Sequence, residues 1–197
     1  MLYDLAHFIK DKCSFLWDAV EWGNAIVFSL LHKKALQGIP QLLKNISNET
    51  FTLRMTNVPD ATKLEKFFEE QPESAFEFFK PHDFDGKTIQ KILRNKAFFT
   101  FVVTEHDNIV GYFFLRAFVN GKCFRGKIVD YRWRNKGIAK QMGIATNCIA
   151  KHLGLRMFAS ISPDNYASLA SSKAVNEVRI VKTLDNGFYY IEYAPKM

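Results

Sequence analysis

The sequence predicts an α/β protein in which a mixed, mostly antiparallel central sheet is flanked by helices and preceded by a separate helical segment. Residues 1–47 carry apolar side chains at helical spacing, whereas from residue 50 onward short β-rich runs alternate with helical ones. Two strong turn signals, Asn120-Gly121 and Asp185-Asn186-Gly187, each separate a pair of strand-like runs and predict antiparallel hairpins. We therefore expect one sheet-based domain with a helical appendage.

The appendage is predicted to contain three helices. Apolar residues spaced between positions 2 and 20 predict the first, and Gly23-Asn24 predicts its end. A second is expected over residues 25–36, and Pro40 is expected in the first turn of a third that ends near Ile46. Aromatic side chains are frequent here, so we expect residues 1–47 to pack on the main domain, 48–197, or to form a homodimer or protein-partner contact.

The main domain is predicted element by element from the change of hydrophobic period along the chain. Strands are expected where β-branched and aromatic residues cluster, and helices where apolar residues recur every three or four positions. The expected strands cover residues 51–55, 98–104, 109–119, 122–130, 155–161, 178–184 and 188–193, and the expected helices cover 59–70, 86–95, 136–153 and 163–175.

Charge and composition narrow the class of ligand. The net charge is +7, and between Lys122 and Arg156 nine Lys or Arg face a single acid, Asp130. Such an excess favours an anionic partner, which could be a nucleotide, a phosphate-bearing cofactor, nucleic acid or lipid. No apolar run approaches the roughly 18 residues of a membrane span, and no signal peptide is evident. Three scattered cysteines predict reduced thiols in a cytoplasmic protein without a metal site.

The strongest motif is the turn Arg134-Asn135-Lys136-Gly137-Ile138-Ala139 between a strand and a long helix. The first turn of a helix presents unpaired N–H groups and positive dipole charge, which suits a phosphate. A glycine there leaves room for the ligand. With the order of elements over residues 50–193, this turn resembles the Arg/Gln-x-x-Gly-x-Gly/Ala signature of the GNAT superfamily of N-acetyltransferases.

That resemblance implies acetyl-CoA as cosubstrate, no metal and no nucleic-acid partner. It also implies a sheet splayed between its fourth and fifth strands, with the pyrophosphate at residues 134–140. The implied reaction is direct acetyl transfer to a primary amine of a small molecule, such as a nucleotide-linked amino sugar. A protein or peptide N-acetyltransferase and a non-catalytic acyl-CoA-binding module are the alternatives. The implied cofactor-binding residues are Ile128, Val129, Asp130, Arg132, Arg134, Asn135, Lys136, Gly137, Ile138, Ala139, Lys140, Asn165 and Ser168.

The sequence departs from the family pattern where protons are transferred. Ser172 stands where many members have a tyrosine that acts as general acid toward the CoA thiolate, and Cys123 stands near the position of a fourth-strand glutamate base. A CoA-like thiol has a pKa of about 8.5, so its thiolate can leave without a dedicated acid, or Tyr166 or Tyr131 can replace one.

On the acceptor side His82 is the best candidate base, with Asp83 and Glu105 as weaker alternatives. His82 lies in the segment Phe79 to Asp85, which resembles an aromatic-Pro-His segment of bacterial GNAT proteins associated with sugar modification. Histidine can take a proton near neutral pH, so His82 is the expected base, with capping of a loop as its structural alternative. The oxyanion is expected to meet a backbone N–H near Val129 or Asp130.

Overall fold

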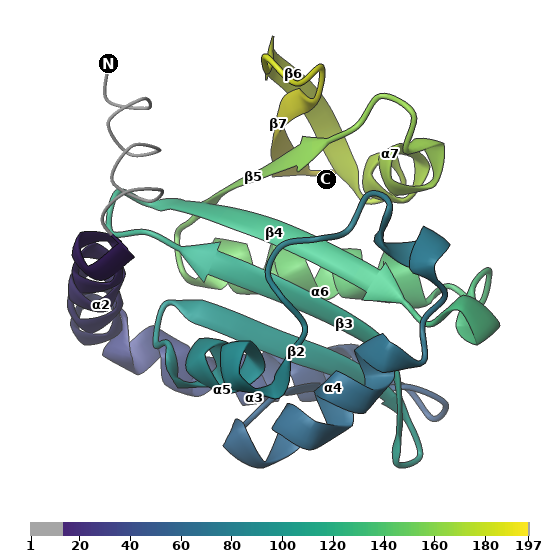
Figure 1. The fold of residues 1–197 in the computed structure, drawn as a ribbon, viewed down its shortest axis with the longest axis horizontal. Coiled ribbons are helices and arrows are strands. Elements are labelled where there is room, and N and C mark those ends of the chain that lie inside the picture. The colour runs from purple at the N-terminus through teal and green to yellow at the C-terminus, as the bar shows by residue number, and fades with distance from the viewer. Residues whose placement is uncertain (1–13, 197) are drawn as a thin grey trace.

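A computed structural model describes residues 14–196 and shows one seven-stranded sheet in the order β1-β2-β3-β4-β5-β7-β6 (Figure 1). All neighbouring strands are antiparallel except β4 and β5, which are parallel. The expected mixed, mostly antiparallel sheet is thereby confirmed. The strands are β1 Thr52–Met55, β2 Phe98–Glu105, β3 Asn108–Ala117, β4 Lys122–Val129, β5 Arg156–Ile161, β6 Asn176–Thr183 and β7 Tyr189–Pro195.

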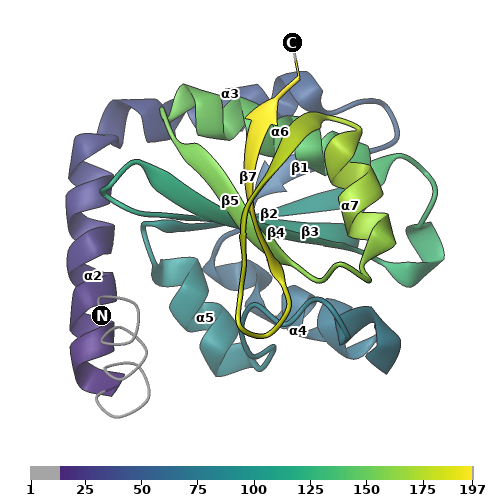
Figure 2. The same cartoon turned by 90° about the horizontal axis from the view of Figure 1, so that it is seen from above.

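Helices cover both faces of this sheet. Figure 2 shows α3 and α6 on one face, α4 and α5 on the other, and α2 along one side. One apolar core lies between the sheet and the α3–α6 layer, and a second, rich in phenylalanine, lies under α4 and α5. The helices are α2 Ser14–Leu31, α3 Lys33–Ile46, α4 Ala61–Glu69, α5 Gly86–Arg94, α6 Ile138–His152 and α7 Tyr166–Lys173, with 3-10 turns at Val58–Asp60, Glu73–Phe76 and Tyr131–Trp133.

The sheet opens between β4 and β5. Their pairing covers only residues 122–124 against 156–158, although β4 continues to Val129. Beyond that point β5 keeps its pairing with β7, over residues 157–161 against 189–193, and so diverges from β4. The edges of two strands that face each other without pairing leave backbone groups available to a ligand. The splay expected from the sequence therefore lies between the fourth and fifth strands.

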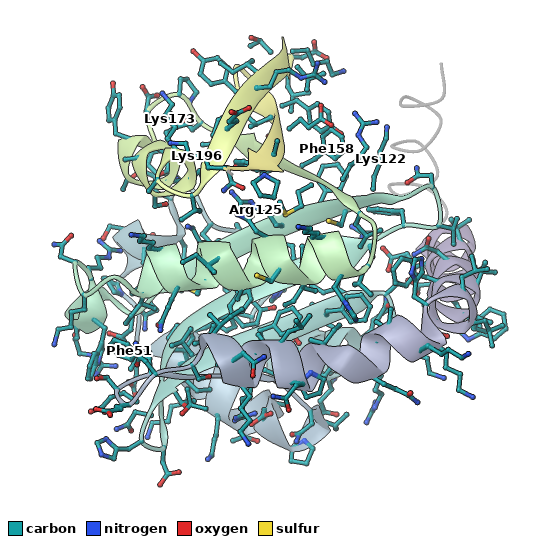
Figure 3. All side chains as sticks on the ribbon, turned by 180° about the vertical axis from the view of Figure 1, so that it is seen from behind. Phe51, Lys122, Arg125, Phe158, Lys173 and Lys196 are labelled. Atoms are coloured by element: carbon teal, nitrogen blue, oxygen red, sulfur yellow. The ribbon has the colours of Figure 1, made fainter. Side chains whose placement is uncertain are left out.

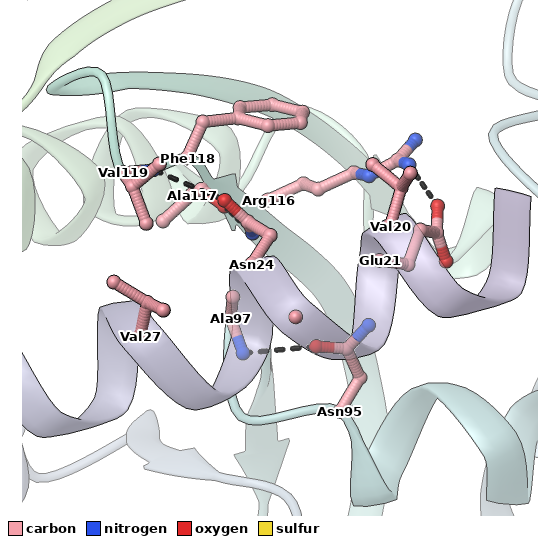
Figure 4. Close-up of a pocket in the computed structure, with 11 residues that line it drawn as sticks. Val20, Glu21, Asn24, Val27, Asn95, Ala97, Arg116, Ala117, Phe118 and Val119 are labelled. Atoms are coloured by element: carbon pink, nitrogen blue, oxygen red, sulfur yellow. Dashed lines mark hydrogen bonds and ion pairs between the residues drawn. The ribbon is translucent and has the colours of Figure 1, made fainter.

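The expected helix break at Gly23-Asn24 is wrong, because α2 runs through it. The tertiary contacts of Asn24 explain this: its amide nitrogen donates to the Ala117 carbonyl at 2.9 Å, and its amide oxygen accepts from the Val119 N–H at 3.0 Å. Figure 4 shows these side chains around a cavity of about 380 Å³ between α2 and the sheet. The part of the first expected helix before residue 14 lies outside the described residues.

The predicted start of a third helix at Pro40 is also wrong. Helix α3 begins at Lys33, and Pro40 lies in its interior. Gly38 permits close contact with α6, since a Cβ there would lie 2.9 Å from Nε2 of His152. Ile39 and Leu43 of α3 belong to the same core as the sheet. Among residues 14–196 no helix is both long and apolar enough to cross a lipid bilayer.

Candidate functional site

A groove of about 1160 Å³ occupies the splay between β4 and β5. The N-terminal end of α6, the start of α7 and the chain between α4 and α5 complete its walls. Figure 1 shows that last segment arching across the front of β3 and β4. The predicted residues that line the groove are Ile128, Val129, Arg134, Asn135, Gly137, Ile138, Ala139, Lys140, Asn165, Tyr166, Ser168 and Ser172.

The glycine turn lines this groove. Gly137 is the N-cap of α6 with φ of 79°, a left-handed conformation that glycine adopts without strain. A Cβ at Gly137 would have no protein atom within 4 Å, so the space beside it is open. Arg134 and Lys140 border the same space. The first turn of α6 therefore offers N–H groups, helix-dipole charge and two cations to an anionic group.

Three predicted cofactor residues lie off the groove: Asp130, Arg132 and Lys136. The carboxylate of Asp130 accepts hydrogen bonds from the backbone and guanidinium of Arg132 and from the Gln71 amide. Burial favours a higher pKa for Asp130, but these donors outweigh it and hold the pKa below its usual value. Gln71 also accepts from the Tyr131 N–H at 3.1 Å, so this network fixes the turn to α4. The Lys136 ammonium lies 4.4 Å from the centre of the Trp133 ring.

The edge of β4 that faces the groove carries unpaired backbone donors. The Asp130 N–H is not one of them, because it donates to the Val110 carbonyl of β3 at 3.0 Å. In an antiparallel ladder alternate residues point their N–H groups to the same side, so the N–H groups of Lys127 and Val129 face away from β3. The ladder with β5 has ended by then. Of the two predicted oxyanion donors, only Val129 has an N–H group that faces the groove. The N–H group of Lys127 faces it as well.

Two half-buried cations on β4 were not anticipated from the sequence. The Lys127 ammonium donates to the Ala139 carbonyl in the first turn of α6 at 2.9 Å. Burial, together with the charge of Arg125, lowers the pKa of Lys127 to about 7. Arg125 lies against the Tyr193 ring, with its guanidinium carbon 3.6 Å from the ring centre. Because side chains alternate between the two faces of a strand, the sequence could have predicted that Arg125 and Lys127 share one face of β4. It could not have predicted that this face borders a groove.

Three residues considered for proton transfer have distinct surroundings. Ser172 is buried, and its hydroxyl accepts from Arg125 at 3.3 Å. Tyr166 lines the groove but is largely exposed. Cys123 lies in the core, where burial raises the pKa of its thiol to about 12. The side chain of Asn165 caps α7 by accepting from the Ser168 N–H at 3.0 Å.

An aromatic wall forms the other side of the groove, on the sheet face opposite α6. Gly126 allows this packing, since a Cβ there would lie 2.4 Å from the Phe114 ring and 3.2 Å from the Phe79 ring. Only two carboxylates line the groove among the described residues, Glu77 on this side and Asp164 near α7. We define the aromatic wall as Phe78, Phe79, Phe98, Phe114 and Phe124.

His82 does not line the groove, although the sequence predicts it as the base. Its Nδ1 lies 2.7 Å from the Asp83 carbonyl, and its Nε2 lies 3.2 Å from the Tyr112 hydroxyl. A carbonyl only accepts, so Nδ1 carries the proton and Nε2 accepts from Tyr112. Burial lowers the pKa of His82, and the ring contacts Phe68 and Phe84. Within residues 14–196 no three His, Cys, Asp or Glu side chains gather as a metal site.

Comparison with known proteins rests on structure alone, because no family model and no curated protein matches the sequence. The GNAT domain of PAT from S. lividans is similar with a TM-score of 0.63 and 16% identity, covering 72% of this chain and 89% of that one. Ribosomal-protein-S5-alanine acetyltransferase from Vibrio fischeri has a TM-score of 0.59 and 17% identity, covering 77% and 94%. The aminoglycoside acetyltransferase AAC(6')-Ib, solved with acetyl-CoA, has a TM-score of 0.59 and 13% identity, covering 75% and 94%. The chain therefore has the GNAT fold.

Proposed function

We propose that this protein is an N-acetyltransferase that transfers the acetyl group of acetyl-CoA to a primary amine of a small molecule. The observation that carries the proposal is the splay of β4 from β5, which leads to the glycine turn at the start of α6. The similar structures include CoA complexes of N-acetyltransferases that act on proteins and on aminoglycosides. They support the class of reaction, while the residues of the groove support its details.

Successive parts of CoA can be matched to successive parts of the groove. The first turn of α6 with Arg134 and Lys140 suits the pyrophosphate. The outward N–H group of Val129, beside the turn, suits an amide carbonyl of the pantetheine arm, and that of Lys127, further along β4, suits the oxyanion. Bound acetyl-CoA supplies an activated acyl group on a thioester. No residue of this chain is needed as a covalent carrier, and the buried Cys123 thiol is unsuited to that role.

The acceptor half of the groove favours an aromatic or anionic amine over a polycation. The aromatic wall supplies ring faces. Among the described residues, Glu77 is the only carboxylate that lines this side of the groove. Lys80 borders the same space, and Arg116, which is paired with Glu21, borders it as well. A base can stack on phenylalanine and its phosphates can meet cations. These features support a nucleotide-linked amino sugar as acceptor and oppose a basic peptide or an aminoglycoside.

The acceptor must lose a proton before it attacks the thioester. An amino-sugar amine is more acidic than a lysine and needs less assistance. His82 is the base predicted from the sequence, but it lies off the groove and its ring nitrogens are both occupied. Glu77 lines the acceptor side and is a second candidate. The comparison of His82→Asn with Glu77→Gln separates the two, since a general base contributes about 10²–10⁴ to the rate.

Two experiments test the proposal. Acetyl-CoA at about 100 times its dissociation constant should stabilise the protein by about 2.7 kcal/mol, and no stabilisation would reject cofactor binding. Thiol release should then be measured with nucleotide-linked amino sugars, free amino sugars, polyamines and N-terminal peptides. Turnover with the first group alone supports the proposed acceptor. Turnover with peptides alone supports the protein N-acetyltransferase, and binding without any turnover supports a non-catalytic module.

The location and assembly of the protein are further parts of the proposal. A cytoplasmic location follows from the need for acetyl-CoA and reduced thiols. Helix α2 exposes Trp22, Leu30 and Leu31, which supports a homodimer or protein contact through the N-terminal segment. Light scattering of the purified chain, with and without Trp22→Lys, tests the homodimer.

A further inference from the structure

Arg125 is a half-buried cation that lines the groove, and no carboxylate pairs with it among the described residues. Figure 3 shows it between α6 and the part of the sheet formed by β5, β6 and β7. Its Nη2 donates to the Ser172 hydroxyl at 3.3 Å, and its guanidinium stacks on the Tyr193 ring. Its Nη1 is buried without a hydrogen-bond partner. A buried guanidinium nitrogen without a hydrogen-bond partner is costly, so a ligand anion at Nη1 is expected to complete its surroundings.

The place of Arg125 along the groove indicates which part of CoA it meets. The ladder between β4 and β5 ends at Phe124, so Arg125 is the first residue of the splay. Val129, beside the turn that suits the pyrophosphate, lies four residues further along β4, which corresponds to about 13 Å of extended strand. An arm that begins at the turn and follows β4 therefore brings its sulfur end toward Arg125 and Ser172.

We propose that Arg125 binds the thiolate of CoA and stabilises it as the leaving group of the reaction. In the step concerned, the amine nitrogen forms a bond to the thioester carbon and the carbon–sulfur bond breaks. The electron pair of that bond moves to sulfur, and the amine proton goes to the base or to water. The guanidinium cannot supply a proton near neutral pH, so it acts by its charge. The inference rests on the proposed acetyl-CoA function.

The surroundings of Arg125 suit this role. Tyr193 holds the guanidinium plane, and Ser172 accepts one N–H, which leaves Nη1 for a ligand. The other charged residues that line the groove are Glu77, Lys80, Arg116, Lys127, Arg134, Lys140 and Asp164. The charge of Arg125 also explains how the site can function with a serine at position 172, because a stabilised thiolate needs no proton from an acid.

The direct test is the thiol pKa of bound CoA, measured from the pH dependence of thiolate ultraviolet absorbance. A cation within about 4–6 Å lowers the pKa of an acidic group by roughly 1–3 units, so the bound thiol should titrate that far below its ordinary 8.5. Arg125→Met should remove the shift, and Arg125→Lys should retain part of it. Arg134→Met is the matched control, because it removes a groove arginine at the turn and should leave the thiol shift intact.

Desulfo-CoA, which lacks the sulfur, separates this inference from the proposed function. At pH 8 a thiol shift of about 1–3 units should make the wild type bind CoA roughly 3- to 200-fold more tightly than desulfo-CoA, and Arg125→Met should bind the two equally. If the wild type binds neither, the proposed function fails. If it binds both equally, with an unshifted thiol, the cofactor site stands and the role of Arg125 fails. A preference for succinyl-CoA over acetyl-CoA that Arg125→Met abolishes would also overturn the inference, since Arg125 would then bind an acyl carboxylate.

Discussion

The surroundings of Lys127 predict that the affinity for CoA falls as pH rises. Its half-buried ammonium donates to the Ala139 carbonyl in the first turn of α6 and is part of no ion pair among the described residues. Burial and the neighbouring Arg125 bring the pKa of Lys127 to about 7. A pyrophosphate at the turn favours the charged form. Binding should therefore be accompanied by proton uptake at Lys127 and should weaken as pH rises.

The magnitude follows from that pKa. In the free protein the charged fraction of Lys127 falls from about nine-tenths at pH 6 to about one-tenth at pH 8, for a pKa of about 7. If only the charged form pairs with the phosphates, the affinity falls about tenfold over this range, which equals roughly 1.4 kcal/mol. Lys127→Met should bind more weakly than the wild type at pH 6 and approach it at pH 8.

Titration calorimetry measures both quantities. The ratio of wild-type to Lys127→Met affinity removes the ionisation of CoA itself, which is common to both proteins. At pH 7, buffers of different ionisation enthalpy should report uptake of about half a proton more in the wild type than in Lys127→Met. Lys140→Met is the control, because it removes an exposed lysine of the same groove and should lower affinity equally at both pH values. Identical pH slopes for the wild type and Lys127→Met would refute the reasoning.

Three further substitutions separate binding from architecture. Gly137→Ala places a Cβ on a left-handed residue, which should cost about 1–2 kcal/mol in calorimetric stability and weaken CoA binding, since the Cβ enters open groove space. His82→Asn leaves the Tyr112 hydroxyl unpaired and should lower the free energy of unfolding in urea by about 1–3 kcal/mol. Its turnover should stay within about threefold of the wild type. A hundredfold loss of turnover would instead support the base role. Asn24→Ala should cost about 1–2 kcal/mol in urea and leave CoA affinity unchanged, and an altered affinity would show that α2 is coupled to the groove.

The features that the sequence predicted well are those with a local physical cause. The turn at Gly137 combines a positive-φ glycine, a preceding strand and a long apolar helix, and each of these leaves a pattern in neighbouring residues. The hairpins at Gly121 and Gly187 are likewise local, and both glycines have positive φ. The order of strands and the splay followed from the family resemblance rather than from any single segment.

The features that the sequence predicted wrongly, or missed, depend on contacts between distant segments. Asn24 and Pro40 look like helix breakers, yet contacts with β3 and α6 outweigh their local cost, which is small beside the packing of a whole helix. The hydrogen bonds of the Asp130 carboxylate with Arg132 and Gln71 were missed, while its predicted place beside the cofactor stays a prediction. Lys127 was missed because its burial depends on how β4, β5 and α6 meet.

The same lysine should give folding and ligand binding opposite pH dependences. The folded pKa of Lys127 lies near 7, below the 10.5 of an unfolded lysine, so the unfolded chain binds more protons between these values. Stability of the free protein relative to Lys127→Met should therefore rise from pH 7 toward pH 10. Bound CoA compensates the buried charge at low pH, so the thermal stabilisation by a fixed CoA concentration should decrease over the lower part of that range. Parallel changes in the two quantities would show that the pyrophosphate does not interact with Lys127.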